Sequence, residues 1–330
     1  MAVRYGVVAL RQDPPLYAAD ESKGTAETVQ TVNVAAILIL SGGNCGLSAC
    51  TTRYLTAMAA SDLLLAVADV ILWRLKEYYF PGTFLDLTPG CSVRSVLKRA
   101  ALDLSVWFTV DFTFDRFVAI GCPKLRTSYC TEQTAMTVLV ITGVLFFLKN
   151  IPYYFAIVPR MTINGVPWHC NPKPSIYTET AWLAFVWLDR TLTPVLPFAL
   201  IFLFNALTVR HILVASQLRK GLRGQSNRSD PEIAGRRKSI VLLFAISGSF
   251  VTLWSLYVIN FLYYNVKGTN YNDSEYIFRR VGYMFLNLSS CTNSFIYVVT
   301  QSKFRMRLTL ALKYPFIRII KILNRFKSQK

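Results

Sequence analysis

The sequence predicts an all-α membrane protein, a seven-transmembrane helix bundle followed by a short amphipathic eighth helix. Of the 330 residues, 53% are hydrophobic, and the mean hydropathy is +0.37, whereas soluble domains are about 45–50% apolar. The apolar residues gather into long blocks, and a bilayer-spanning helix needs about 20 such residues in a row. Basic residues follow two of these blocks directly, as cytoplasmic flanks of membrane helices do.

Seven apolar blocks follow one another along the chain. They run Val32–Leu40, Tyr54–Trp73, Val96–Ile120, Thr134–Phe155, Ala181–Leu213, Ser239–Tyr264 and Tyr276–Thr300. The first block spans only about 14 Å as a helix, half of a bilayer core. Arg11–Gln30 is polar and contains Pro14 and Pro15, so we do not expect it to extend this span. Either the first helix is incomplete, or the first thirty or so residues are a mis-assigned start, and we favour the second interpretation.

These blocks divide the chain into three regions. Residues 1–30 form an extracellular amino-terminal segment, residues 31–300 the seven-helix domain with its short first span, and residues 301–330 an amphipathic helix with a basic cytoplasmic tail. In the last region Phe304, Leu308 and Leu312 recur at intervals of four among basic residues. That spacing predicts a helix lying on the bilayer surface.

Charge placement predicts the orientation. Lys and Arg total 36 against 18 Asp and Glu, a net charge of +18, which in a soluble protein would suggest nucleic acid. Here the densest basic stretches, Arg210–Lys238 and Lys303–Lys330, each follow an apolar block. They are therefore expected to face the cytoplasm and anionic lipid, with no nucleic-acid partner. The sequence predicts a multi-pass plasma-membrane protein with an extracellular amino terminus and a cytoplasmic carboxyl terminus.

This topology separates the seven cysteines. Only Cys91 and Cys170 fall in outward-facing segments, where the compartment is oxidising, so they are the expected disulfide pair. The outward segment Asn272-Asp273-Ser274 is a glycosylation sequon close to the membrane.

A polar stripe runs along the third span. Residues spaced by threes and fours lie on one helix face, and here they are Cys91, Ser95, Lys98, Leu102, Ser105, Thr109, Phe112 and Arg116. Arg116 belongs to the triplet Asp115-Arg116-Phe117 at the expected cytoplasmic end. Lys98 lies about 27 Å away by helical rise, near the outer leaflet. The stripe therefore connects the two sides of the membrane.

The triplet resembles the Asp-Arg-Tyr signature of class A (rhodopsin-like) G-protein-coupled receptors, and Cys91 precedes it by the family's spacing. Further landmarks of the resemblance are Asn33, Ala60–Leu64, Pro197, Trp254 and Asn293–Tyr297. Within the class, Arg53–Leu55, Ile151–Tyr154 and Thr252–Trp254 resemble the orphan subfamily thought to sense aromatic amino acids. The resemblance implies a receptor rather than an enzyme, which binds a small extracellular ligand and activates a heterotrimeric G protein. Arrestin and a receptor kinase are further partners that it implies.

Several positions depart from the family pattern. Ser294 and Leu256 replace prolines, and Asn205 replaces a tyrosine. Proline removes a backbone hydrogen bond and kinks a helix, so we expect the outward swing of the sixth helix to differ in amplitude. Arg236 stands where many relatives place an acid that restrains Arg116, which predicts elevated basal activity.

Charged and aromatic residues within the spans are candidates for the ligand pocket, since intramembrane ionisable groups usually face a cavity or a partner. The candidates are Lys98, Asp69, Leu102, Asp189, Arg190, Trp254, Tyr257, Arg279 and Tyr283. Lys98 either meets a ligand carboxylate or pairs internally with Asp69, and both can hold if the ligand competes. Interfacial anchoring is the alternative for the other charges, and packing for the aromatic residues. Asp103 and Lys149 are expected to form a structural pair.

On the cytoplasmic side, the resemblance implies a G-protein crevice. Its residues are Asp115, Arg116, Phe117, Asn205, Asn293 and Tyr297. The resemblance also implies a sodium-binding cluster of Asp62, Ser105, Ser289 and Asn293, since oxygen ligands suit a hard cation. A water-filled hydrogen-bond network is the alternative. No other metal or cofactor is expected.

Three other classes of protein are alternatives to a signalling receptor. A transporter would show an internal repeat or paired broken spans, and neither is present in the sequence. A retinal-binding photoreceptor needs a lysine in its last span, and Tyr276–Thr300 has none. A non-signalling or degenerate receptor stays an alternative, because the first span is short and two prolines are missing.

Overall fold

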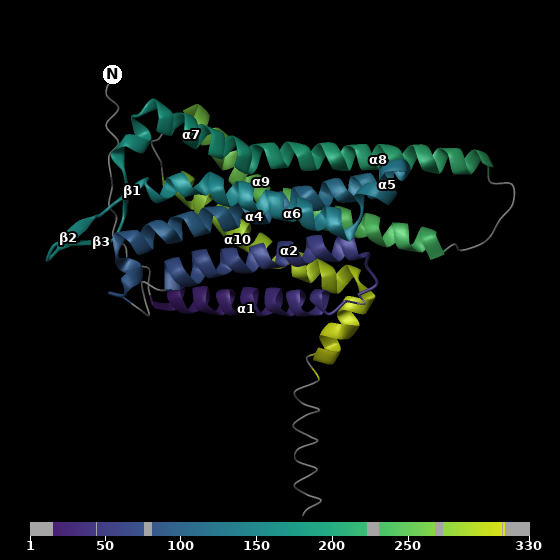
Figure 1. Cartoon of the computed structure of the whole chain (residues 1–330), viewed down its shortest axis with the longest axis horizontal. Coiled ribbons are helices and arrows are strands. Elements are labelled where there is room, and N and C mark those ends of the chain that lie inside the picture. Colours follow the sequence, from purple (N-terminus) through teal and green to yellow (C-terminus); the bar gives the residue numbers. More distant parts are fainter. Residues whose placement is uncertain are drawn as a thin grey trace, which may run out of the picture.

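A computed structural model describes residues 16–43, 45–75, 81–222, 231–267, 273–311 and 313. Long helices lie side by side and give the bundle its length (Figure 1). They are α1 (Leu16–Ser41), α2 (Ala49–Leu65) with its continuation η1 (Ala66–Leu75), α4 (Thr88–Gly121), α6 (Glu132–Asn150), α7 (Thr180–Arg190) with η5 (Thr191–Val195) and α8 (Leu196–Leu222), α9 (Pro231–Lys267) and α10 (Asp273–Thr300). Within the described residues these elements form the seven spans of the expected bundle.

Short elements cover the two ends of the bundle. At the end that carries Cys91 and Cys170, here named the disulfide end, lie η2 (Phe84–Asp86), η3 (Ile151–Tyr154), β1 (Ile157–Val158), β2 (Met161–Ile163), β3 (Val166–Trp168), β4 (Asn171–Pro172) and η4 (Pro174–Tyr177). Strand β1 pairs antiparallel with β4, and β2 with β3. At the opposite end, named the Arg116 end, lie α5 (Pro123–Tyr129) and the helix of residues 302–311 (Figure 1).

The helices differ in how apolar they are. By length and composition, three described stretches could cross a membrane: Glu132–Tyr154, Thr180–Gln217 and Arg237–Tyr263, and Val29–Ser41 is a shorter apolar stretch. Helices α4 and α10 are less apolar because they turn polar side chains into the bundle. Asp103, Asp115 and Arg116 on α4 and Asn293 on α10 are all buried.

The first helix starts earlier than the sequence suggested. Helix α1 begins at Leu16, so polar residues that we expected to lie outside the span are helical. Helical backbone does not require apolar side chains, whereas membrane crossing does. Where the membrane boundary lies on α1, and hence the predicted domain boundary at residue 31, stays a prediction.

The fifth span is interrupted in its first third, between α7 and α8. Thr193 has non-helical backbone angles (φ −147°, ψ 105°) directly before Pro194. The break therefore lies ahead of Pro197, the proline that the sequence resemblance had singled out. Proline lacks the N–H that would bond an upstream carbonyl, and at this break Trp107 Nε1 donates to the Leu192 carbonyl oxygen at 3.2 Å.

The missing prolines leave two helices uninterrupted. Helix α9 continues through Leu256 and α10 through Ser294. Ser294 also makes a contact that proline could not make, because its Oγ donates to Asn33 Oδ1 at 2.9 Å. Asn33 Nδ2 in turn donates to the Ser290 carbonyl oxygen at 2.9 Å. These two hydrogen bonds fasten α1 to α10.

Candidate functional site

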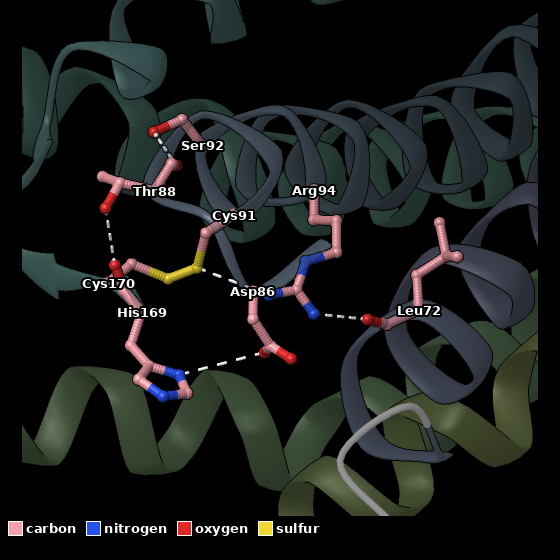
Figure 2. Close-up of a disulfide and its surroundings, with 8 residues drawn as sticks. All are labelled: Leu72, Asp86, Thr88, Cys91, Ser92, Arg94, His169 and Cys170. Atoms are coloured by element: carbon pink, nitrogen blue, oxygen red, sulfur yellow. Dashed lines mark hydrogen bonds and ion pairs between the residues drawn. A yellow bond between two sulfur atoms is a disulfide. The ribbon is translucent and has the colours of Figure 1, made fainter. Parts of the chain in front are cut away.

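Cys91 and Cys170 form the predicted disulfide, with Cα atoms 6.2 Å apart. Figure 2 shows its surroundings at the start of α4. Thr88 Oγ1 donates to the His169 carbonyl oxygen at 2.9 Å, and the His169 imidazole lies 3.9 Å from the Asp86 carboxylate. The buried Arg94 donates to the Leu72 carbonyl oxygen at 2.5 Å. The disulfide and the Thr88 hydrogen bond hold the segment before β4 against α4, and the Arg94 hydrogen bond holds α4 against η1.

A cavity of about 590 Å³ lies at the disulfide end between α4, α7, α9 and α10, and Cys170 is part of its wall. Six of the predicted ligand residues line it: Leu102, Asp189, Arg190, Tyr257, Arg279 and Tyr283. The wall also contains Arg99, Tyr153 and Asn260, which the sequence interpretation missed. Helical spacing could have found Asn260, because it follows Tyr257 by three residues on α9.

Lys98 and Asp69 form an ion pair between α4 and η1. Neither residue lines the cavity, so the structure shows the internal pairing that was the alternative to a ligand contact. A role of this pair in ligand binding stays a prediction.

Three ionisable residues form a buried charge cluster beside the cavity. Lys149 Nζ lies 2.7 Å from the Asp103 carboxylate, as the expected pair, and also 2.5 Å from the Asp189 carboxylate. Asn150 Nδ2 and Thr193 Oγ1 donate to Asp103 at 2.5 and 2.7 Å. Asp189, which the sequence placed at the pocket rim, is therefore a structural partner as well as a lining residue.

Positive charge is in excess around the cavity. Among the described residues that line it, Arg99, Arg190 and Arg279 stand with the carboxylates of Asp103 and Asp189, which share Lys149, and Arg99 also lies 3.6 Å from the Asp189 carboxylate. The Arg99 guanidinium lies 3.7 Å from the centre of the Tyr153 ring. Those of Arg190 and Arg279 lie 5.9 and 5.7 Å from the rings of Phe261 and Tyr283.

An aromatic column descends from the cavity into the core. Tyr283 contacts Tyr257, with ring centroids 5.5 Å apart, and Tyr257 contacts Trp254 at 5.8 Å. Trp254, which is buried and does not line the cavity, stacks on Phe250 at 5.1 Å. Tyr257 and Tyr283 therefore line the cavity, whereas Trp254, which was predicted to bind ligand, packs below its wall.

Below this column lies the cluster around Asp62. Ser105 Oγ and Asn293 Nδ2 donate to the two oxygens of the buried Asp62 carboxylate at 2.5 and 2.9 Å. Ser289, the fourth expected member, accepts a hydrogen bond from Trp254 Nε1 at 3.2 Å. Ser289 therefore connects the column to the neighbourhood of Asp62.

At the Arg116 end, the triplet is held in a network of hydrogen bonds. Arg116 Nε donates to Asp115 Oδ2 at 2.9 Å, and a terminal guanidinium nitrogen donates to Ser239 Oγ on α9 at 3.2 Å. Cys50 Sγ donates to the other Asp115 oxygen at 3.0 Å. A hydroxyl group thus restrains Arg116 across the helices, and the side chain of Arg236 lies outside the described residues.

Three other predicted crevice residues are Phe117 on α4, Asn205 on α8 and Tyr297 on α10. The Phe117 ring stacks on Phe204 with centroids 6.0 Å apart. Asn205 Oδ1 and Tyr297 Oη are buried without a hydrogen-bond partner in the described part of the chain. Such groups are costly to bury, and both become satisfied if the crevice opens to water or to a partner.

Two groups at the end of α5, those of Tyr129 and Cys130, have raised pKa values. Burial, with a smaller contribution from the Asp115 charge, raises the pKa of the Tyr129 hydroxyl to about 12 and that of the Cys130 thiol to about 11. Both side chains are therefore neutral at physiological pH.

Two further polar residues of the sequence are Asp111 and Asn272. Asp111, for which the sequence offered no partner, accepts a hydrogen bond from Thr142 Oγ1 at 2.9 Å. Asn272 of the glycosylation sequon lies outside the described residues.

The helical bundle has a disulfide-tethered cavity at one end and the triplet Asp115-Arg116-Phe117, with its buried arginine, at the other. This arrangement indicates a seven-helix membrane receptor. Residues 32–297 match the rhodopsin family of 7 transmembrane receptors, and the chain belongs to this family. Its members are multi-pass plasma-membrane proteins that signal as receptors and are not enzymes.

Named relatives support the same class. The chain is 20% identical to the FMRFamide receptor of Drosophila melanogaster over 270 residues, covering 76% of this chain and 46% of the relative. It is 23% identical to the Tachykinin-like peptides receptor 86C of Drosophila melanogaster, covering 82% and 53%. It is 24% identical to the G-protein coupled estrogen receptor 1 of Mus musculus, covering 61% and 47%. The chain spans about half the length of these relatives, and none of the three is named for an aromatic amino acid.

Proposed function

We propose that this chain binds a ligand in the cavity at the disulfide end and, in response, activates a heterotrimeric G protein at the Arg116 end. The observation that carries the proposal is that the cavity and the Arg116 triplet both lie on α4, at opposite ends of the bundle. From the cavity, the aromatic column leads to Trp254 and its hydrogen bond to Ser289 on α10, and Asn293 on the same helix donates to Asp62. The disulfide end faces outward in this proposal, because disulfides persist in oxidising compartments.

The mechanism is a ligand-biased population shift. Ligand binds more tightly to a state in which the cavity has contracted around it, and the column transmits that change to Trp254. The Arg116–Ser239 hydrogen bond between α4 and α9 then breaks, and the inner ends of the helices separate. A neutral hydroxyl holds Arg116 more weakly than a carboxylate would, which supports the expectation of basal activity.

The chemistry of the cavity favours an aromatic ligand that carries a carboxylate. The guanidinium groups of Arg190 and Arg279 attract a carboxylate, whereas Arg99 pairs with Asp189, and the rings of Tyr153, Tyr257 and Tyr283 line the same space. A volume of about 590 Å³ lies within the usual range for small-molecule sites. An aromatic amino acid meets these requirements, in agreement with the subfamily resemblance of the sequence. A peptide is the second candidate, favoured by the peptide receptors among the relatives.

The first test is G-protein activation in cells that express the chain at the surface. L-tryptophan and L-phenylalanine are compared with their carboxamides, and short peptides are compared as free acids and as amides. Arg116→Ala should lower ligand-driven signalling by about tenfold or more, because it removes the buried cation of the crevice. Arg160→Ala serves as the matched control, since Arg160 is an exposed arginine away from both sites. Surface-expressed protein that gives neither basal nor ligand-driven signal would support the non-signalling alternative.

The partners follow from the same proposal. The G protein occupies the crevice around Arg116, Asn205 and Tyr297, and arrestin and a receptor kinase act on the same end after activation. The helix of residues 302–311 lies against the lipid surface, where its basic residues meet anionic headgroups.

We further propose that the Asp62 cluster holds a sodium ion or water. A carboxylate, two hydroxyls and an amide supply the oxygen ligands that suit a hard cation, and Asp62 already accepts from Ser105 and Asn293. If sodium binds, replacing it with N-methylglucamine should change agonist potency about fivefold or more in the wild type and leave Asp62→Asn unchanged. Equal potency in both salts for the wild type would favour the water network.

A further inference from the structure

Asn260 is a buried amide in the wall of the cavity. It lies on α9 one turn beyond Tyr257, with only 5% of its surface exposed. Its Oδ1 atom has no hydrogen-bond partner in the described part of the chain. Buried polar side-chain atoms nearly always find partners, so an orphan acceptor in a cavity wall requires an explanation.

Three other buried amides of the bundle make hydrogen bonds between helices, although Asn150 Oδ1, like Asn260 Oδ1, has no partner among the described residues. Asn33 bonds to Ser290 and Ser294, Asn150 donates to Asp103, and Asn293 donates to Asp62. Each of these amides connects two helices, and Asn260 makes no comparable contact among the described residues. Asn260 therefore lacks the helix-connecting role that explains the others.

Two guanidinium groups of the cavity wall lie against aromatic rings. Those of Arg190 and Arg279 lie over the rings of Phe261 and Tyr283. Arginine supplies donors only, so the carboxylate-binding part of the cavity and the Asn260 acceptor offer complementary chemistry. A ligand that carries an anionic group and an N–H or O–H donor would satisfy both.

We propose that Asn260 is a specificity-determining residue, whose amide oxygen accepts a hydrogen bond from a donor group of the ligand. The ligand-binding part of this inference rests on the proposed function, whereas the predicted effect of Asn260 on stability does not. Selection against a ligand without the donor follows because such a ligand would leave Oδ1 buried and unpaired. The anionic group binds to the arginines, and Asn260 then distinguishes among anions.

The experiment compares wild type with Asn260→Leu, which has similar volume and no polar atoms, and with Asn260→Asp, which keeps an acceptor. Thermal unfolding of the purified full chain is measured in lipid nanodiscs without ligand. Removing an orphan acceptor should raise the melting temperature by about 2 °C. Asn150→Leu is the matched control and should lower it, because Asn150 donates to Asp103. An unchanged or lower melting temperature for Asn260→Leu overturns the proposal.

The second arm uses two probes, L-tryptophan and indole-3-propionic acid, which differ only in the α-ammonium donor. The wild type should bind L-tryptophan about tenfold more tightly than indole-3-propionic acid. Asn260→Leu should lose this preference, and Asn260→Asp should keep it. An undiminished preference in Asn260→Leu overturns the proposal. If neither probe binds the wild type while Asn260→Leu is still stabilised, the small-ligand proposal fails and the assignment of Asn260 as an unsatisfied recognition group is supported.

Discussion

Replacing Lys149 with methionine should remove most folded protein from the cell surface. Lys149 is the ammonium that Asp103 and Asp189 share, and its side chain is only 11% exposed. Methionine fills a similar volume but leaves the buried Asp103 carboxylate without its counter-ion, whereas Asp189 keeps Arg99 at 3.6 Å. Breaking a buried ion pair costs about 3–5 kcal/mol, a large part of the 5–15 kcal/mol that typically stabilises a fold. Surface immunostaining and the melting temperature of purified protein measure the loss.

Removing all three charges of the cluster should restore part of the lost stability and surface expression. Lys149→Met together with Asp103→Asn and Asp189→Asn removes the charges along with their partner, and replacing a whole buried ion cluster is tolerated far better than breaking it. Lys124→Met is the control, because Lys124 is exposed on α5 and surface substitutions usually change stability by less than about 0.5 kcal/mol. Wild-type expression of Lys149→Met alone would show that the cluster does not stabilise the fold.

Loss of the disulfide should have the second large effect. Cys91→Ser or Cys170→Ser opens a link between residues separated by 79 positions, and removing such a bond typically costs about 2–5 kcal/mol in small secreted domains. Because Cys170 is part of the cavity wall, ligand response should fall more than surface expression does. Both are measured in the same cells, with the signal normalised to surface protein.

Two comparisons make this prediction specific. The double variant Cys91→Ser/Cys170→Ser should behave like either single variant, because each removes the same bond. Cys122→Ser should behave like wild type, since Cys122 is a free cysteine at the Arg116 end. A normal ligand response from Cys170→Ser would contradict a role of the tether in shaping the cavity.

The sequence predicted those features that depend on spacing along one helix or on depth in the membrane. The Asp103–Lys149 pair was found because both residues were expected at similar depths on adjacent spans, and the disulfide because only two cysteines fall in segments that were predicted to face outward. Asp189 as the third member could not be found this way, because its position depends on how the interrupted fifth span packs against α6. The hydrogen bond from Trp254 to Ser289 was missed for a similar reason. Which polar group bonds to the Ser289 hydroxyl depends on how the helices pack in three dimensions.

Other features leave no trace in a single sequence. An amide that has no partner cannot be distinguished from one that has, so Asn260 looked like an ordinary polar residue among apolar ones. The start of α1 was missed because polar residues outside the membrane can form a helix, as they do in soluble proteins. In both cases the sequence gives the residue type, and packing decides what surrounds it.

The contacts of Asn33 have a consequence for biosynthesis. Its hydrogen-bond partners lie 257 and 261 residues further along the chain, and its span is the shortest apolar block. While the chain is being made, α1 must therefore hold a polar amide without its native partners until α10 has been inserted. Helix α1 is made well before α10 and is thus among the last to reach its final set of interactions, so its retention in the bilayer depends on the completion of the bundle.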